Sequence, residues 1–211
     1  MLHNAENIAK LQFITSDDCS LSYLEQIKTV LDNGVGWVQL RAKKLDESQF
    51  AKVAEAAKKI TESHKAVLII NDHVNVAKAV DAEGVHIGKE DLSPSIARQE
   101  LGAKIIGGTA NTLEDILLKQ QYVNYIGLGP FRFTSTKKKL SPVLGTEGYR
   151  DILQKVPGNL PVIGIGGVLA EDIEDLLNTG LHGIAVSGAI INDAQPAKKI
   201  KQFLKAIEAY V

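Results

Sequence analysis

Short apolar runs alternate with longer amphipathic stretches from one end of the chain to the other. The apolar runs are rich in Val, Ile and Leu, as in VLII and PVIGI, and turn residues bound them. Runs of this kind are typical of buried β-strands. They predict eight strands, at residues 11–15, 37–41, 67–71, 84–87, 104–108, 124–128, 161–165 and 183–187.

The stretches between these runs carry apolar residues at intervals of three and four, which predicts amphipathic helices. The clearest lie at residues 21–31, 47–63, 74–80, 112–119, 170–179 and 196–209. Asp46 is placed to cap the second of these helices, and Gly180 to end the one at 170–179. Strands that alternate with helices in this way indicate repeated βα units.

The strands are apolar almost throughout, which indicates burial on both faces, as in a parallel sheet covered by helices. Eight such units predict an α/β fold of the (β/α)8 TIM barrel type, as one domain over residues 1–211. The competing architecture is an open doubly wound sheet. The chain lacks GxGxxG after its first strand and shows no division into two halves, so we favour the barrel.

Composition narrows the class of partner. With 24 basic and 25 acidic residues the formal net charge is -1, which provides no electrostatic case for nucleic acid or an anionic membrane. Cys19 is the single cysteine, so an intramolecular disulfide is excluded and a reducing cytoplasm fits. The sequence shows neither a membrane-spanning run nor a signal pattern at its start, and we expect a cytoplasmic protein that recognises its ligand locally.

Polar residues gather where the predicted strands end. In a barrel of this type the loops after the carboxyl ends of the strands build the active site. The residues at these ends include Gln39, Arg41, Lys43, Asn71, Asp72, Lys89, Asp91, Thr109, Asn111, Gly166, Gly167, Ser187 and Gly188.

Cations and carboxylates occur together in this set, in Arg41 and Lys43 on one hand and Asp72 and Asp91 on the other. A diphosphate bound with Mg²⁺ uses both kinds, because carboxylates hold the metal ion and cations neutralise the remaining phosphate charge. The alternative is that each aspartate caps the helix after it, with Ser93 and Pro94 starting a turn. Capping alone does not account for the cations beside them.

The segment GLGPFRFTSTKKKLSPVLG, residues 127–145, is a second candidate. It supplies hydroxyls from Thr134, Ser135 and Thr136 beside Lys137, groups that hold phosphate oxygens. A solvated basic loop is the alternative. Phe131 and Phe133 bracket Arg132 in this segment, where either a flat heterocycle could stack or the rings pack as in any loop.

A monophosphate site is expected after the last two strands, where phosphate commonly binds in such barrels. Main-chain N–H groups at Gly167, Ser187 and Gly188 can approach a phosphate closely where no Cβ intervenes. Tight packing is the alternative for the glycines. Two eye-catching residues are given no part in the site: His86 faces the opposite side of its strand from Val85 and Ile87 and is assigned to the interior, and Trp37 is assigned a structural role.

The motifs in their order resemble the thiamine phosphate synthase family over nearly the whole chain. They are QLRAK, INDHVNVAKAVDAEGVHIGKEDL, IIGGTANTLEDI, YIGLGPFRFTSTKKK, PVIGIGG and GIAVSGAI. The resemblance implies a transferase that joins hydroxymethylpyrimidine diphosphate to a thiazole phosphate, or its carboxylated form, and releases pyrophosphate. The partners it implies are small molecules, and it leaves a homo-oligomer open.

The resemblance also implies roles for individual residues. Asp72 and Asp91 would bind Mg²⁺, and Arg41, Lys43 and Lys137 would act on the departing diphosphate. The pyrimidine diphosphate would contact Gln39, Arg41, Lys43, Asn71 and Lys137. The thiazole phosphate would contact Thr134, Ser135, Thr136, Gly167, Ser187 and Gly188.

This chain departs from its relatives at Thr109 and Asn111, where many of them have serine and histidine, and at Gly188, where they have serine. Thr109 keeps the hydroxyl. A thiazole tautomerase of the related barrel family would need a base at the position of Asn111, which counts against that alternative. A non-catalytic phosphate sensor would not need the carboxylates together with Arg41.

Overall fold

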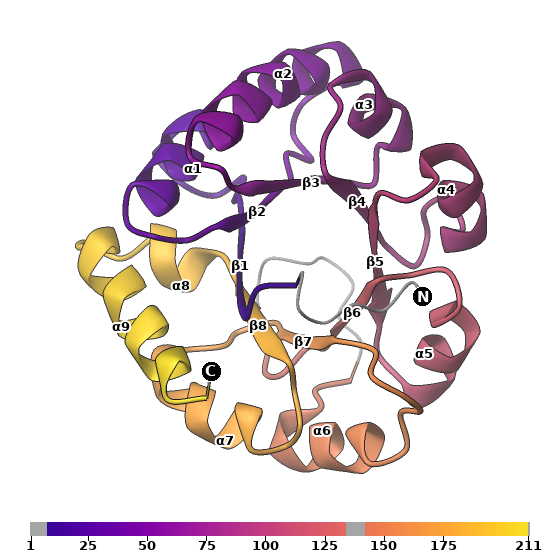
Figure 1. Cartoon of the computed structure of the whole chain (residues 1–211). Helices are drawn as coiled ribbons and strands as arrows, with labels where there is room; N and C mark the ends of the chain where they lie inside the picture. Colours follow the sequence, from indigo (N-terminus) through magenta and orange to yellow (C-terminus); the bar gives the residue numbers. More distant parts are fainter. Residues whose placement is uncertain (1–7, 134–141, 211) are drawn as a thin grey trace.

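Eight parallel strands form a closed barrel, and helices surround it on the outside, in the computed structural model of the chain (Figure 1). The structure describes residues 8–133 and 142–210. The strands are β1 (Leu11–Ile14), β2 (Trp37–Leu40), β3 (Val67–Asn71), β4 (Gly84–Ile87), β5 (Ile105–Ala110), β6 (Tyr125–Leu128), β7 (Val162–Ile165) and β8 (Gly183–Val186). Each strand pairs with the next, and β1 closes the ring on β8, so the predicted TIM barrel is confirmed.

The helices follow the strands in alternation. They are α1 (Tyr23–Leu31), α2 (Glu47–Ser63), α3 (Val74–Ala79), α4 (Pro94–Leu101), α5 (Leu113–Lys119), α6 (Gly145–Leu153), α7 (Ile173–Leu177), α8 (Gly188–Ile191) and α9 (Pro196–Glu208), with a 3₁₀ turn, η2 (Ala170–Asp172), before α7. No helix in the described part of the chain is both long and apolar enough to cross a membrane.

Local sequence explains several helix ends. Asp46 caps α2 as predicted, since its carboxylate accepts the Gln49 N–H at 2.8 Å. Ser22 and Thr112 form the same reciprocal arrangement at α1 and α5. Gly180 follows the end of α7 with φ of 99°, a left-handed conformation that favours glycine.

Three short helices lie outside the stretches in which the sequence shows the clearest helical pattern. Only a turn was predicted at Ser93, but Ser93 and Pro94 start α4, with serine as the cap and proline at its first position. Two glycines in α6 weaken its intrinsic helix propensity, and α8 spans only four residues, too few for a periodic signal.

The side chains alternate across each strand, as a pleated strand requires. Phe13, Val38 and Val85 point outward into the main core between sheet and helices. A second, smaller apolar cluster fills the inside of the barrel and includes Trp37 and Ile69, which agrees with the structural role predicted for Trp37. The ring of Trp37 packs edge-on against that of Tyr125, with centroids 4.9 Å apart.

The two ends of the connection between β6 and α6 are held together. Leu144 N–H donates to Pro130 O at 2.9 Å, and Gly145 N–H donates to Phe131 O at 3.0 Å. The Tyr149 hydroxyl, buried in α6, donates to Leu128 O at 2.6 Å and so joins the helix to the end of β6. Both ends of the connection are therefore fixed to the barrel.

Candidate active site

The closed barrel brings the polar residues at the carboxyl ends of β2, β3 and β4 to one side of its mouth. Lys43, in the loop after β2, forms an ion pair with Asp72 in the loop after β3. Asn71 Nδ2 donates to the same carboxylate oxygen, Asp72 Oδ2. The Asp72 side chain is only 11% exposed, and its φ of 63° is a left-handed conformation that aspartate and asparagine adopt more readily than most residues.

Asp91 completes this cluster from the loop after β4. Its Oδ2 accepts the Gly88 N–H at 3.0 Å, and the two carboxyl groups of Asp72 and Asp91 share a hydrogen bond. Burial and the neighbouring Asp72 charge raise the pKa of Asp91 above its usual range. Burial alone would also raise the pKa of Asp72, but the hydrogen bond from Asp91 and the Lys43 ammonium outweigh it and lower that pKa.

Neither aspartate caps a helix. His73 occupies the cap position of α3 without a side-chain bond, and Ser93 caps α4, so the capping alternative is wrong for both. The aspartates are free to act together at the mouth. A cavity of about 250 Å³ adjoins Asp72 and is lined by Glu47, Asp72, His73, Val74, Asn75 and Leu92.

The donor set suits a divalent cation that arrives with phosphate. No group of three or more His, Cys, Asp or Glu side chains with metal-site geometry occurs within residues 8–133 and 142–210. Mg²⁺ commonly takes only one or two carboxylates and completes its shell with water and phosphate oxygens. Two neighbouring carboxylates therefore fit Mg²⁺ bound together with phosphate better than a metal held by protein groups alone.

Arg41 lies on the same side of the mouth and is held by residues that the sequence analysis missed. Its Nη1 donates to Asp17 Oδ2 at 3.1 Å, and the Tyr23 hydroxyl donates to Asp17 Oδ1 at 2.8 Å. Burial and the bond to Asp17 raise the pKa of Tyr23 to about 12, so the hydroxyl keeps its proton. The guanidinium is thus fixed from the loop after β1.

A chain of buried polar groups crosses the inside of the barrel beneath the mouth. Gln39 Nε2 donates to Gln12 Oε1 at 3.3 Å, and Gln12 Nε2 donates to the Tyr125 hydroxyl at 3.2 Å. His86 lies between the Tyr125 hydroxyl, 3.1 Å from its Nδ1, and Thr109 Oγ1, 3.0 Å from its Nε2. The interior assignment of His86 is confirmed. Gln39 and Thr109 lie at the two ends of this series of hydrogen-bonded side chains.

Thr109 was predicted to follow its strand, but β5 continues to Ala110. The longer strand turns the Thr109 hydroxyl into the barrel rather than into a loop. The signal for this was the β-branched residue itself, because threonine favours strands.

The other side of the mouth is formed by the turn after β7 and the end of β8. Gly166 and Gly167 have φ of 96° and 71°, and a Cβ at Gly167 would collide with the Arg132 side chain. Ser187 and Gly188 follow β8, and Ser187 Oγ is buried without a hydrogen-bond partner within the described residues. A buried hydroxyl without a partner costs free energy unless a ligand satisfies it.

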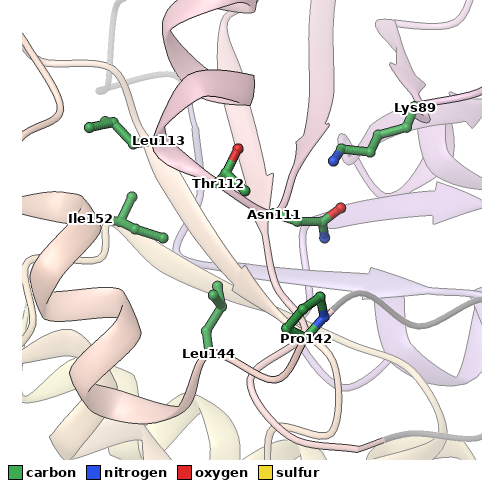
Figure 2. A pocket seen from close by; sticks show the side chains of 7 residues that line it. All are labelled: Lys89, Asn111, Thr112, Leu113, Pro142, Leu144 and Ile152. Atoms are coloured by element: carbon green, nitrogen blue, oxygen red, sulfur yellow. The ribbon is translucent and has the colours of Figure 1, made fainter.

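Next to the mouth lies a larger cavity of about 380 Å³, between the end of β5 and α6. Figure 2 shows Lys89 and Asn111 at its polar edge and Leu113, Leu144 and Ile152 on its apolar walls. Lys89 pairs with Asp115 at 2.6 Å, and Asn111 Nδ2 donates to Gly129 O. Both polar groups thus bind protein partners.

Four predicted site residues lie outside the described residues: Thr134, Ser135, Thr136 and Lys137. Of the two rings beside them, Phe131 is buried and packs against Tyr149, whereas Phe133 is 75% exposed. Phe131 is therefore a packing residue, which leaves only Phe133 as a ring that could stack on a ligand from this segment.

Comparison with known proteins identifies the family. The family model of thiamine monophosphate synthase matches residues 11–190, which contain all eight strands of the barrel and all the predicted site residues. The chain belongs to this family. Membership makes the protein a transferase of thiamine biosynthesis, as the motifs implied.

Several thiamine-phosphate synthases are similar to this family member over nearly their whole length. The one from Bacteroides fragilis strain ATCC 25285 is 47% identical over 199 residues, which cover 92% of this chain and 98% of that protein. The one from Flavobacterium johnsoniae is 46% identical over 210 residues, covering 96% and 98%. The solved thiamine phosphate pyrophosphorylase from Pyrococcus furiosus superposes with a TM-score of 0.88 at 29% identity, covering 99% of this synthase and all of that chain.

Proposed function

We propose that this enzyme joins hydroxymethylpyrimidine diphosphate to thiazole phosphate by a dissociative substitution that depends on Mg²⁺. The observation that carries the proposal is the shared site of Asp72, Asp91 and Lys43 at the mouth, above a polar barrel interior. A cytoplasmic location, the absence of a nucleic-acid partner and a possible homo-oligomer stay predictions from the sequence.

The diphosphate subsite is assigned to the side of the mouth formed by β2, β3 and β4. Asp72 and Asp91 would hold Mg²⁺, which when bound neutralises charge on the diphosphate oxygens. Arg41 and Lys43 supply cations for the remaining charge, and Asn71 donates from its amide. Lys137 is assigned to the same group from the sequence alone.

The pyrimidine ring is assigned to the mouth directly above the barrel interior, over Gln39 and Thr109. Both side chains are more than 90% buried, and both belong to the hydrogen-bonded chain through His86 and Tyr125. A flat heterocycle that enters the mouth would therefore meet fixed polar groups at two points. The thiazole phosphate is assigned to Gly167, Ser187 and Gly188, with Thr134, Ser135 and Thr136.

The chemistry needs no protein base. The carbon–oxygen bond of the pyrimidine diphosphate breaks, and both electrons leave with pyrophosphate. The electron-rich aminopyrimidine stabilises the methylene cation that forms, and the thiazole nitrogen attacks it with its own lone pair to give a thiazolium. The residues described above stabilise the leaving group, align the two reactants and exclude water.

A thiazole tautomerase remains the alternative activity. It must move a proton, but the residue at the relevant position, Asn111, carries an amide that already donates to Gly129 O. An amide does not act as a base near neutral pH, so the site favours the synthase. A sensor without catalysis would have no use for the paired carboxylates.

The deciding experiment is incubation of the purified protein with both substrates and Mg²⁺, followed by chromatography of the products. We expect thiamine phosphate and pyrophosphate in equal amounts, and loss of both when a chelator is added. Isomerised thiazole phosphate without thiamine phosphate would establish the tautomerase instead. Turnover that survives removal of all divalent metal would contradict the assigned role of Asp72 and Asp91.

A further inference from the structure

Arg132 joins the start of the connection between β6 and α6 to the turn after β7. Its two terminal nitrogens donate to the two carboxylate oxygens of Asp172, at 2.7 and 2.6 Å. Two parallel bonds of this kind fix both the position and the plane of the groups they join. The carboxylate is fixed from its other side as well, because Asp172 Oδ2 also accepts the Leu169 N–H at 2.7 Å.

The guanidinium also rests on the core. Its central carbon lies 4.7 Å from the centre of the Phe131 ring, which is buried against Tyr149. A cation above an aromatic face is attracted by the ring quadrupole. The Arg132 side chain is therefore held by a ring, a carboxylate and a main-chain oxygen at once.

Arg132 holds both carbonyl groups of the glycine turn. Its own N–H donates to Gly166 O at 3.0 Å, and its Nη1 donates to Gly167 O at 3.0 Å. In a trans peptide the carbonyl and the following N–H point in opposite directions. The two bonds therefore set the directions of the Gly167 and Val168 N–H groups, and neither group has a protein acceptor in residues 8–133 and 142–210.

We propose that Arg132 and Asp172 are positioning residues for the thiazole phosphate subsite. They hold the Gly166–Gly167 turn so that its N–H groups are oriented before the phosphate arrives, which removes an ordering cost from binding. The inference rests on the proposed function, since it takes this turn as the phosphate subsite. The pair is neutral as a whole, so it acts through orientation rather than through charge.

The competing role for Arg132 is direct charge attraction of the phosphate. The two roles predict opposite effects of removing the Asp172 charge. If Arg132 is a positioning residue, Asp172→Asn loosens it and weakens phosphate binding. If Arg132 is itself a phosphate ligand, Asp172→Asn frees an uncompensated cation and strengthens phosphate binding.

The test is steady-state kinetics of the full chain with each substrate varied in turn, for Arg132→Gln and Asp172→Asn. We expect KM for the thiazole phosphate to rise about tenfold in both variants, with KM for the pyrimidine diphosphate and kcat changed less than about twofold. Arg132→Lys keeps the charge but not the two-pronged contact, and we expect an intermediate KM. KM for the thiazole phosphate in the double variant should not exceed the higher of the two single-variant values, because both substitutions disrupt the same Arg132–Asp172 ion pair.

Arg98→Gln is the matched control. Arg98 also donates to main-chain oxygens, of Gly102, Lys104 and Tyr122, but in the loops at the opposite end of the barrel. We expect this variant to lose thermal stability without a change in either KM. It separates general loosening of the barrel from an effect on the turn.

Three outcomes would overturn the proposal: a lower KM for the thiazole phosphate in Asp172→Asn, an equal rise in both KM values, or unchanged KM values in folded variants. If Arg132→Gln does not fold, the isosteric Asp172→Asn carries the same test. Wild-type protein that makes no thiamine phosphate would contradict the proposed function instead. Calorimetric titration of wild type and Asp172→Asn with thiazole phosphate then tests the turn independently of turnover.

Discussion

The two sides of the barrel mouth are built from different kinds of groups. After β2, β3 and β4 the mouth presents charged side chains, with Lys43 paired to Asp72 and Arg41 held by Asp17. After β7 and β8 it presents main chain, in the Gly166–Gly167 turn and at Ser187 and Gly188. The loops of this barrel thus offer two different kinds of groups that can bind an anion, namely charged side chains on one side and main-chain N–H groups on the other.

This difference predicts which substitutions and which changes of metal or pH should affect each side. A side chain that binds through its charge responds to neutralisation, to metal and to pH. A main-chain site responds instead to an added Cβ or to a shifted peptide plane, and hardly to charge. Each of the following experiments acts on one side and leaves the other as its reference.

Asp72→Asn should have the largest effect. Asparagine tolerates the left-handed conformation of residue 72, so the substitution removes the charge with little backbone strain. We expect kcat to fall on the order of a hundredfold or more, as for loss of one strong electrostatic contact in an active site. Quenched-flow assays with Mg²⁺ titrated over a wide range would measure it.

Asp18→Asn is the control for this experiment, because Asp18 pairs with Lys44 on the exposed rim. It should leave kcat nearly unchanged. A similar loss in both variants would mean that general charge around the mouth, rather than ligation by Asp72, explains the effect.

Gly167→Ala should have the next largest effect, on the other side of the mouth. A Cβ there meets the Arg132 side chain, and alanine is strained at φ of 71°. We expect the free energy of unfolding to fall by about 1–3 kcal/mol and KM for the thiazole phosphate to rise, with KM for the pyrimidine diphosphate unchanged. Denaturant titration and initial rates measure the two effects.

Gly158→Ala separates strain from collision. Gly158 has φ of 74°, and nothing lies within 4 Å of a Cβ built there. It should lose only the stability that backbone strain accounts for, less than Gly167→Ala loses, and it should keep both KM values. If Gly167→Ala also leaves both KM values unchanged, the turn does not contact the phosphate, and the assignment of a main-chain phosphate site after β7 is wrong.

Tyr125→Phe should have a smaller effect on turnover and a clear effect on stability. The missing hydroxyl leaves Gln12 and His86 each short of a buried partner, which costs about 1–3 kcal/mol. KM for the pyrimidine diphosphate should rise more than KM for the thiazole phosphate. Gln39 and Thr109, which are proposed to contact the pyrimidine, are the two ends of the hydrogen-bonded series that contains Tyr125. Tyr122→Phe is the control, since the Tyr122 hydroxyl has no protein partner among the described residues. An equal loss of stability in both variants would show that the hydrogen bonds of Tyr125 do not stabilise the barrel interior.

Asp91→Asn should have the smallest effect on stability, in an unusual direction. Because the pKa of Asp91 is raised in the folded protein, the folded state binds a proton more tightly than the unfolded state does. Stability from this group therefore falls as pH rises through the raised pKa, and the charge is unfavourable at neutral pH. We expect Asp91→Asn to raise Tm at pH 7 in metal-free buffer while it lowers turnover; a lower Tm at pH 7 that also persists at pH 4 would contradict this.

Most of the architecture could be predicted from the chain because strands and helices leave local periodic signals. The eight apolar runs fall on the eight strands, and the residue types at their ends singled out Asp72 and Asp91, which the structure brings together. The short helices α6 and α8 left no such signal, since glycines and brief length hide the period.

The supporting contacts of the site could not be predicted. Asp17 meets Arg41 across 24 residues, Arg132 meets Asp172 across 40, and Gln12 meets Tyr125 across 113. Such pairs depend on which way a side chain points once the barrel has closed, and neither residue of a pair carries a local mark of the other. Arg132 was noticed only as a residue between two phenylalanines, although it holds the glycine turn.

The joined ends of the connection between β6 and α6 bear on how such an enzyme can diverge. Main-chain hydrogen bonds join Pro130 and Phe131 to Leu144 and Gly145. These bonds bring the two ends of the loop together. The entropy of closing a loop grows only slowly with its length. The closure is therefore made by main-chain bonds at its two ends and does not depend on which side chains stand between Phe133 and Pro142. Under the proposed function, a lineage could exchange the residues proposed to contact the thiazole phosphate here while the rest of the fold stayed under unchanged selection.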